Sequence, residues 1–251
     1  MIEHVFRRAS AARLVSAVLV ATDDDRIASA VRAFGGAAVL TRADHVSGTD
    51  RIAEVVAAHP CRAVVNLQGD EPLIEPDTID AAVAPMLADP SLEMSTVSRP
   101  LLNAEEFHNP NVVKVVTNLA GDALYFSRAP IPSAVPSTSA LRATADKSAA
   151  LVNSVPSAAL VNSVPSAARA HMGLYVYRRD TLLRLAALPA VPLELIESLE
   201  QLRALAHGIR IRVVDTPHLT MAVDTPADLE RVRSAVAALE LVRSGGGPHQ
   251  G

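Results

Sequence analysis

Apolar runs of strand length alternate with amphipathic helical segments through the first half of this chain, and this alternation constrains the fold most. We predict strands over 16–21, 37–40 and 62–68. Helices are predicted over 24–34 and 50–59, where apolar side chains recur every three or four residues. Parallel strands need such helical connections, so the pattern predicts an α/β fold with a mostly parallel sheet and helices on both faces.

The composition supplies a core for such a fold and excludes several classes of protein. Of the 251 residues, 49% are apolar and only 3% aromatic, so small side chains must fill much of the core. The net charge of −4, with acids and bases interspersed, argues against binding to nucleic acid or to a membrane surface. No apolar run is long enough to cross a bilayer, and the N-terminus does not resemble a signal peptide. The single cysteine, Cys61, is expected to be a small buried side chain in a cytoplasmic protein.

The second half of the chain changes character and predicts a smaller mixed β region. Its strands are expected over 94–98, 111–117, 122–126, 171–178 and 209–215. A long amphipathic helix is expected over 192–208, with leucines at 195, 199, 202 and 205 on its apolar face. The last helix should begin at Pro226, with Thr225 as its N-cap and Asp228 near its third position.

A low-complexity segment interrupts this second half. The nine-residue sequence Ala-Leu-Val-Asn-Ser-Val-Pro-Ser-Ala occurs at 150–158 and again at 159–167. Two copies are too few for a solenoid, so a duplication within a surface loop is the simpler interpretation. We therefore predict one domain over 1–243, a poorly ordered loop over 133–168 and a loose tail over 244–251.

Two aspartates are candidate metal ligands. Asp70 follows the predicted strand 62–68, and ligands in open α/β sheets bind just beyond the carboxyl ends of strands. Gln68 is a hydrogen-bonding group beside it. Asp224 precedes the last helix, and only the fold could bring the two acids together. With phosphate oxygens and waters they would form an octahedral Mg²⁺ site; the alternatives are an acidic turn and an acid favoured by the helix dipole.

A polar cluster at 45–51 lies between a predicted strand and a predicted helix. Ser47 and Gly48 are small enough to let the backbone approach a flat ring, and Ser47 or Thr49 could cap the helix. The helix N-terminus would attract an anion, and Arg51 could reach a phosphate or a base. The alternative is an ordinary capped helix at the surface.

Two further sets of polar side chains each share one face of a predicted element. On the predicted strand these are His171, Tyr175 and Tyr177. On the predicted long helix these are Glu194, Glu197 and Gln201. A ligand with many hydroxyl groups and a carboxylate would need such a lining, although the helix set also fits a solvated surface.

Seven motifs, in order along the chain, resemble the family of 3-deoxy-manno-octulosonate (Kdo) cytidylyltransferases, also called CMP-Kdo synthetases. The motifs lie at 41–51 (T-R-A-D-H-V-S-G-T-D-R), 66–72 (N-L-Q-G-D-E-P), 109–116, 123–128, 171–178, 199–203 and 223–231. The resemblance covers residues 1 to about 235 apart from the 133–168 loop.

The resemblance implies a Rossmann-like nucleotidyltransferase fold. It implies transfer of a cytidylyl group from CTP to Kdo, with Mg²⁺, in lipopolysaccharide biosynthesis, by a cytoplasmic homodimer. Asp70 and Asp224 would hold Mg²⁺ and serve catalysis. The nucleotide would contact Ser47, Gly48 and Arg51. The residues implied for the sugar are Gln68, His171, Tyr175, Glu194 and Glu197.

The chain departs from the family pattern at its start. The family opens with a strand and a basic glycine-containing loop, and nothing similar precedes the residues that align with Met1–Val5. We expect a truncated gene model whose printed form has little activity, because several positioned charges would be missing. The alternatives are a cytidylyltransferase for a related acidic sugar, such as an 8-amino-Kdo analogue, and a remnant that binds nucleotide or a partner without turnover.

Overall fold

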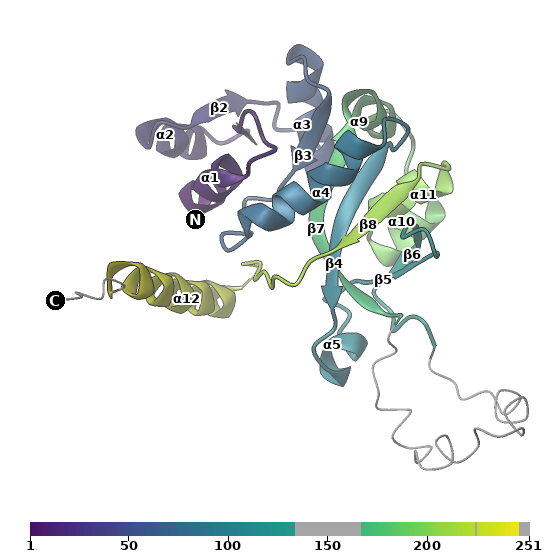
Figure 1. Ribbon diagram of the computed structural model, residues 1–251. Helices are drawn as coiled ribbons and strands as arrows, with labels where there is room; N and C mark the ends of the chain where they lie inside the picture. The colour runs from purple at the N-terminus through teal and green to yellow at the C-terminus, as the bar shows by residue number, and fades with distance from the viewer. Residues whose placement is uncertain (134–166, 224, 246–251) are drawn as a thin grey trace, which may run out of the picture. The chain divides into compact units, whose positions relative to one another are not determined.

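The computed structural model describes residues 1–133, 167–223 and 225–245 (Figure 1). The chain divides into two compact units. The first comprises Met1–Val97, Gly173–Ala187 and His218–Gly251, and the second comprises Ser98–Met172 and Leu188–Pro217. Nearly all of the predicted loop 133–168 and most of the tail 244–251 lie outside the described residues. A single domain over 1–243 stays a prediction, since two compact units can belong to one domain.

The first unit begins with the alternation that the sequence predicts. Its elements are α1 (Ile2–Ala11), β1 (Leu19–Thr22), α2 (Asp25–Ala33), β2 (Ala37–Leu40), α3 (Gly48–Ala58) and β3 (Ala63–Asn66). The Asp24 side chain accepts a hydrogen bond of 2.7 Å from the Arg26 N–H and so caps α2. Gly35, at φ +83°, follows the helix in the left-handed conformation that glycine favours. β1 pairs in parallel with β2, Leu19 opposite Ala37.

The pairing of β3 differs from the prediction of a mostly parallel sheet. β3 pairs antiparallel with β7 (Arg169–Arg178), placing Ala63 opposite Arg178 and Asn66 opposite Tyr175. The sheet around β7 is therefore mixed. The sequence did not predict this, because a short apolar run can pair with a strand of either direction. α3, α4 (Pro76–Ala88) and α9 (Arg179–Ala186) pack on β3.

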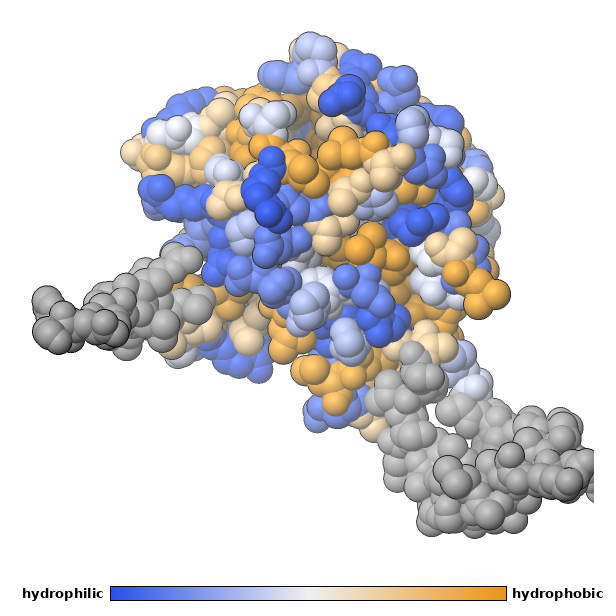
Figure 2. Space-filling view, in the orientation of Figure 1, coloured by the Kyte–Doolittle hydropathy of each residue, from blue (hydrophilic) through white to orange (hydrophobic). Residues whose placement is uncertain are grey.

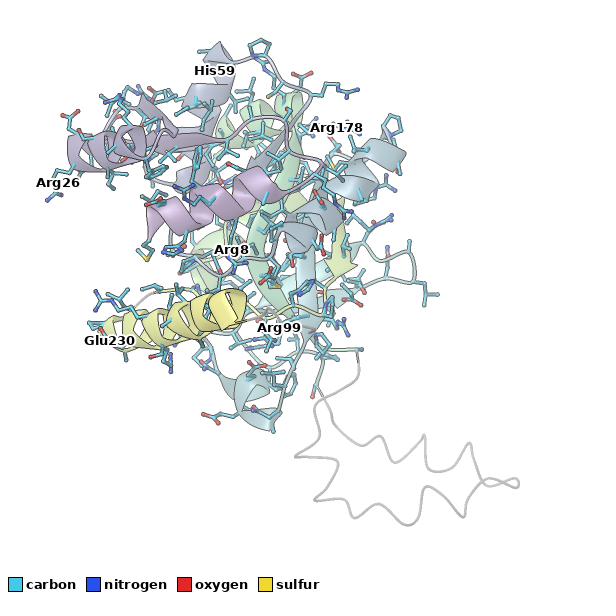
Figure 3. All side chains as sticks on the ribbon, turned by 60° about the vertical axis from the view of Figure 1, so that its left-hand side comes forward. Arg8, Arg26, His59, Arg99, Arg178 and Glu230 are labelled. Carbon is cyan, nitrogen blue, oxygen red and sulfur yellow. The ribbon has the colours of Figure 1, made fainter. Side chains whose placement is uncertain are left out.

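Side-chain hydrogen bonds connect α4 and the segment that follows it to other parts of the first unit. Asp80 on α4 accepts hydrogen bonds from the backbone N–H groups of Arg13 and Leu14, at 3.1 and 2.8 Å. Arg178, at the end of β7, donates to the carbonyl oxygens of Asp89 and Leu92, which follow α4, at 2.9 and 3.1 Å (Figure 3). Arg178 also donates to the carbonyl oxygen of Met86, in the last turn of α4, which has no partner within the helix.

The core of the first unit is aliphatic, as the low aromatic content predicts. Among its fully buried side chains are Val31, Ile79, Met86, Met94 and Val176. Hydrophobic side chains also lie at the surface over α4, where Leu87 is 52% exposed (Figure 2).

The second unit combines short strands with short helices. Its elements are α5 (Ala104–His108), β5 (Lys114–Thr117), β6 (Ala123–Ser127), α10 (Pro192–Glu197), α11 (Gln201–Ala206) and β8 (Ile211–Asp215), with the ends of β4 (Met94–Pro100) and β7. β5 pairs antiparallel with β6 and with the first residues of β7. Val115 and Phe126 are fully buried between these elements and their helices.

The prediction of one long helix over 192–208 is wrong. The chain forms two short helices, because Ser198 adopts a left-handed conformation (φ 52°, ψ 48°) that ends α10. The Leu199 N–H then donates to the Glu194 carbonyl oxygen at 3.1 Å. Leu199 and Leu202 are buried, as predicted, but Leu195 is 67% exposed.

The last helix, α12 (Pro226–Gly245), begins where the sequence predicts. The Thr225 hydroxyl accepts from the Asp228 N–H at 3.2 Å, and the Asp228 carboxylate accepts from the Thr225 N–H at 2.9 Å. This is a reciprocal capping box. The prediction for Cys61 is wrong, because its side chain is exposed. In the described part of the chain, no helix has the length and apolar character needed to cross a membrane.

Candidate active site

Arg51 lies where the first strands of the first unit end. Its guanidinium donates to the Thr41 hydroxyl at 2.6 Å and to the Arg42 carbonyl oxygen at 3.3 Å, and it pairs with the Asp23 carboxylate at 3.2 Å. Asp23 follows β1, and Thr41 follows β2. Arg51 on α3 thus places its positively charged guanidinium at the carboxyl ends of two parallel strands, where nucleotides bind in α/β folds.

The N-terminus of α3 is capped as the sequence predicts. The Ser47 hydroxyl accepts a hydrogen bond of 3.1 Å from the Asp50 N–H. His45, in the preceding loop, contacts the Glu54 carboxylate, and this hydrogen bond lowers the pKa of Glu54. Ser47 and His45 thus fix the loop that precedes α3. The positive end of the α3 dipole can then attract an anionic ligand beside this loop.

The end of β3 lies against the N-terminus of α3. A Cβ atom at Gly48 would lie 3.2 Å from the Gln68 Nε2, a tight contact, so glycine leaves room for the Gln68 carboxamide close to the helix. Gln68 Nε2 donates to the Asn66 Oδ1 at 3.1 Å. Asn66 is paired with Tyr175 on β7, and the Tyr175 ring lies 6.0 Å from that of Tyr177. Gly48, Gln68 and Tyr175 thus lie close to one residue, Asn66.

Asp70 is half-buried just beyond β3, and its backbone contacts the segment that precedes α12. The Val223 N–H donates to the Asp70 carbonyl oxygen at 2.9 Å. Asp224, which follows Val223 in the sequence, lies outside the described residues. The fold therefore joins the two segments that carry the predicted metal ligands.

The donor chemistry of this region fits Mg²⁺. Over the described residues, no group of three or more His, Cys, Asp or Glu side chains is placed to hold a metal ion. Mg²⁺ in proteins usually has one or two carboxylate ligands, with substrate phosphates and waters completing its coordination. Asp70, at the end of a strand, offers one such carboxylate.

In the second unit, His171 packs against an aromatic ring. The centroids of His171 and Phe126 lie 5.0 Å apart in an edge-on arrangement. Burial lowers the pKa of His171 to about 3, so the imidazole is neutral at neutral pH. It can donate or accept a hydrogen bond there but offers no positive charge.

Glu194 and Glu197 on α10 point to different partners in the second unit. The Glu194 carboxylate binds the Arg203 guanidinium, whose Nε donates at 2.9 Å, and this bond lowers the pKa of Glu194. The Glu197 carboxylate accepts from the Ser127 hydroxyl at 2.7 Å and from the Arg128 N–H at 2.9 Å. Gln201, the third member of the predicted face, is buried on α11. The break at Ser198 is the reason that these residues do not form one helix face.

Comparison with known proteins decides the family. Residues 1–211 match the family model described as Cytidylyltransferase. The chain is 50% identical over 239 residues to the 3-deoxy-manno-octulosonate cytidylyltransferase of Syntrophotalea carbinolica, covering 95% of this chain and 89% of that protein. It is also 50% identical over 232 residues to the enzyme of the same name from Geobacter sulfurreducens, covering 92% and 87%. The chain belongs to the 3-deoxy-manno-octulosonate cytidylyltransferase family.

Solved structures agree with membership of the Kdo cytidylyltransferase family. A CMP:2-keto-3-deoxy-manno-octonic acid synthetase complexed with CTP matches with a TM-score of 0.80 and 41% identity, covering 94% of this chain and 87% of that one. The 4-diphosphocytidyl-2C-methyl-D-erythritol synthase of Anaerococcus prevotii matches with a TM-score of 0.57 at 8% identity, which shows a shared fold alone. The predicted family and the nucleotidyltransferase fold are thus confirmed.

The first unit brings together most of the residues predicted for a Kdo cytidylyltransferase. It contains Ser47, Gly48, Arg51, Gln68, Asp70 and Tyr175. The other described candidates, His171, Glu194 and Glu197, belong to the second unit. The roles of all these residues stay predictions.

Sequence reasoning did not single out two buried polar residues, one in each unit. Asn66 ends an apolar strand with a buried amide, and that change from apolar to polar was the available signal. Lys114 is fully buried, and its Nζ donates to the carbonyl oxygens of Asn109, Val112 and Arg128. Burial lowers the pKa of Lys114. Lys114 interrupts the apolar run at 112–116, and that setting was the available signal.

Proposed function

We propose that the chain transfers the cytidylyl group of CTP to Kdo, giving CMP-Kdo and pyrophosphate for lipopolysaccharide biosynthesis. Family membership, at 50% identity over 95% of the chain, gives the reaction. The structural observation that supports this proposal is the Val223–Asp70 hydrogen bond. It joins the two segments of the first unit that contain the predicted metal ligands.

The 2-hydroxyl oxygen of Kdo attacks the α-phosphorus of CTP in line with the leaving group. A bond forms between that oxygen and phosphorus, the bond to the β-phosphate oxygen breaks, and the hydroxyl proton passes to solvent. Such a reaction needs positioning and charge neutralisation more than covalent help from the protein. This is the kind of work that fixed groups at the carboxyl ends of strands can do.

In this proposal the nucleotide contacts Ser47, Gly48 and Arg51. The N-terminal N–H groups of α3 attract an anion, and Gly48 lets the backbone approach the ligand. Arg51 is held by Thr41 and Asp23, so little side-chain entropy is lost when it meets a phosphate or a base. Asp70 and Asp224 would hold Mg²⁺, which when bound neutralises charge on the phosphate oxygens.

The residues proposed to contact the sugar are Gln68, Tyr175 and His171. The neutral imidazole of His171 suits a hydroxyl group of the sugar, since the pKa of about 3 removes any ionic role. Glu194 and Glu197 are also proposed to bind the sugar, and their carboxylates are held in place by Arg203, Ser127 and Arg128. The enzyme works as a homodimer in the cytoplasm, as its family resemblance implies.

A pyrophosphate-release assay tests the proposal. The purified 251-residue chain is incubated with CTP, Kdo and Mg²⁺, and each component is omitted in turn. Sustained release that requires all three would overturn the expectation of little activity and remove the alternative of a remnant without turnover. Asp70→Asn should abolish the release, which excludes a contaminating enzyme. An 8-amino-Kdo analogue in place of Kdo measures selectivity for the sugar. Absence of release with all components present would overturn the proposal.

A further inference from the structure

Asn66 is a buried polar residue at the junction of three segments of the first unit. It is the last residue of β3 and only 2% exposed. An amide buried this deeply needs hydrogen-bond partners to offset its lost hydration. Its partners therefore reveal what holds this part of the unit together.

Both ends of the Asn66 carboxamide meet residues near the N-terminus of α3. Its Oδ1 accepts from Gln68 Nε2 at 3.1 Å, and its Nδ2 lies 3.5 Å from the Thr49 Oγ1. Thr49 is the second residue of α3 and is 2% exposed. Asn66 thus links the strand end to the helix beside Ser47, with the longer contact to Thr49 the weaker of the two.

The bond to Gln68 fixes a side chain that is otherwise exposed. Gln68 lies at the surface, where a free glutamine samples several rotamers. The bond from Nε2 to Asn66 uses one of its two N–H donors, and Gly48 leaves room for its carboxamide beside the helix. Within the described part of the chain, the other N–H and the carbonyl oxygen of Gln68 have no hydrogen-bond partner, so they can meet a ligand.

We propose that Asn66 is a positioning residue: its carboxamide holds Gln68 against Gly48, in the orientation that receives the acceptor sugar. This rests on the proposed function, in which Gln68 contacts that sugar. A buried amide suits this role because its oxygen accepts from Gln68 and its N–H group is a donor to Thr49. A side chain of similar size that can only donate or only accept could not make both contacts. Misplacing a substrate-contacting group by about 1 Å can cost about 10²-fold in rate.

A double-mutant cycle tests whether Asn66 acts through Gln68. The variants are Asn66→Leu, Gln68→Ala and the double variant, assayed with saturating CTP and varied Kdo. We expect each single variant to lower kcat/KM for Kdo by about 10-fold to 100-fold. The double variant should be no worse than Gln68→Ala by more than about 3-fold, since a group already removed cannot be misplaced. The KM for CTP should change little.

A matched control separates positioning from stability. Ser95 is also fully buried in the first unit, and its hydroxyl donates to the Ala82 carbonyl oxygen at 2.6 Å. Ser95→Ala should lower the melting temperature and leave the KM for Kdo unchanged. Should Asn66→Leu fail to fold, Asn66→Ser, too short to reach Gln68, takes its place in the cycle.

The outcomes separate this inference from the proposed function. If the wild-type chain releases no pyrophosphate, the proposed function fails. If the wild type is active and the two single effects multiply in the double variant, Asn66 does not act through Gln68. If Asn66→Leu only lowers the melting temperature, as Ser95→Ala should, Asn66 is structural and the inference is overturned.

Discussion

The Val223 N–H donates a hydrogen bond of 2.9 Å to the Asp70 carbonyl oxygen. This bond joins the turn after β3 to the segment before α12, two parts of the chain that are far apart in sequence. Each segment carries one of the two acids that the sequence identifies as a metal ligand. The bond is made by backbone groups, so any residue other than proline at position 223 can donate it.

The two acids should be needed for turnover. We expect Asp70→Asn and Asp224→Asn each to lower kcat by about 10²-fold or more, because charge on the phosphates would be poorly neutralised. Each should also raise the Mg²⁺ concentration that gives half-maximal pyrophosphate release. Asp180→Asn, whose side chain on α9 is 96% exposed, is the control and should leave both values unchanged. Wild-type activity in either site variant would contradict the assignment.

The Val223–Asp70 bond can be removed without touching either acid. Val223→Pro removes the N–H donor, whereas Val223→Ala keeps it. We expect Val223→Pro to lower kcat about 10-fold or more by displacing the neighbouring segment, and Val223→Ala to remain close to the wild type. Pyrophosphate release against Mg²⁺ concentration measures both. Equal activity of the two variants would mean that the bond does not matter for catalysis.

The pKa of His171 predicts a loss of stability in mild acid. Its pKa in the folded chain, about 3, lies below its ordinary value of 6.5. The unfolded chain therefore binds the extra proton first, and stability contributed by the neutral ring falls as pH drops from 6.5 towards 3. The loss is at most about 1.4 kcal/mol per pH unit. Urea unfolding between pH 5 and 7 should show this slope.

Replacing His171 provides the control for that slope. His171→Phe keeps an aromatic ring beside Phe126 and removes the titrating group. Its free energy of unfolding should vary less between pH 5 and 7 than that of the wild type. An unchanged slope would assign the acid sensitivity to other groups.

The Glu194–Arg203 pair should act as one unit in stability. The two side chains are 10% and 12% exposed, and the hydrogen bond from Arg203 lowers the pKa of Glu194. Glu194→Met or Arg203→Met leaves a charge poorly solvated, which costs about 3–5 kcal/mol. The double variant should cost clearly less than the sum of the two, as measured by denaturant unfolding. Additive losses would show that the two charges do not depend on each other.

Ser198 should be replaceable by glycine but not by valine. Its φ of 52° is costly for a residue with a side chain, by about 1–2 kcal/mol, and is most costly for a β-branched one. We expect Ser198→Gly to match or exceed the wild type in melting temperature and Ser198→Val to lower it. A higher melting temperature for valine would indicate that the break between α10 and α11 is not required.

Short-range signals were enough for several parts of this structure. The strand predicted over 37–40 is β2 with the same bounds, and the helix predicted over 24–34 is α2, which differs from the prediction by one residue at each end. Ser47 caps α3, and Thr225 and Asp228 form the cap of α12. In each case the deciding interactions lie within a few residues, so the sequence itself contains both partners.

The features that the local sequence pattern did not predict depend on residues that are distant in the chain. The antiparallel pairing of β3 with β7, the break at Ser198 and the contacts of Arg51 were not predictable from neighbouring residues. The motifs at 66–72 and 223–231 identified two acids, but only the tertiary structure joined their segments through Val223 and Asp70. The sequence thus determined the elements, their caps and the chemistry available to them. Folding decided which of those groups meet, because the free energy of a distant contact depends on all the packing that brings its two sides together.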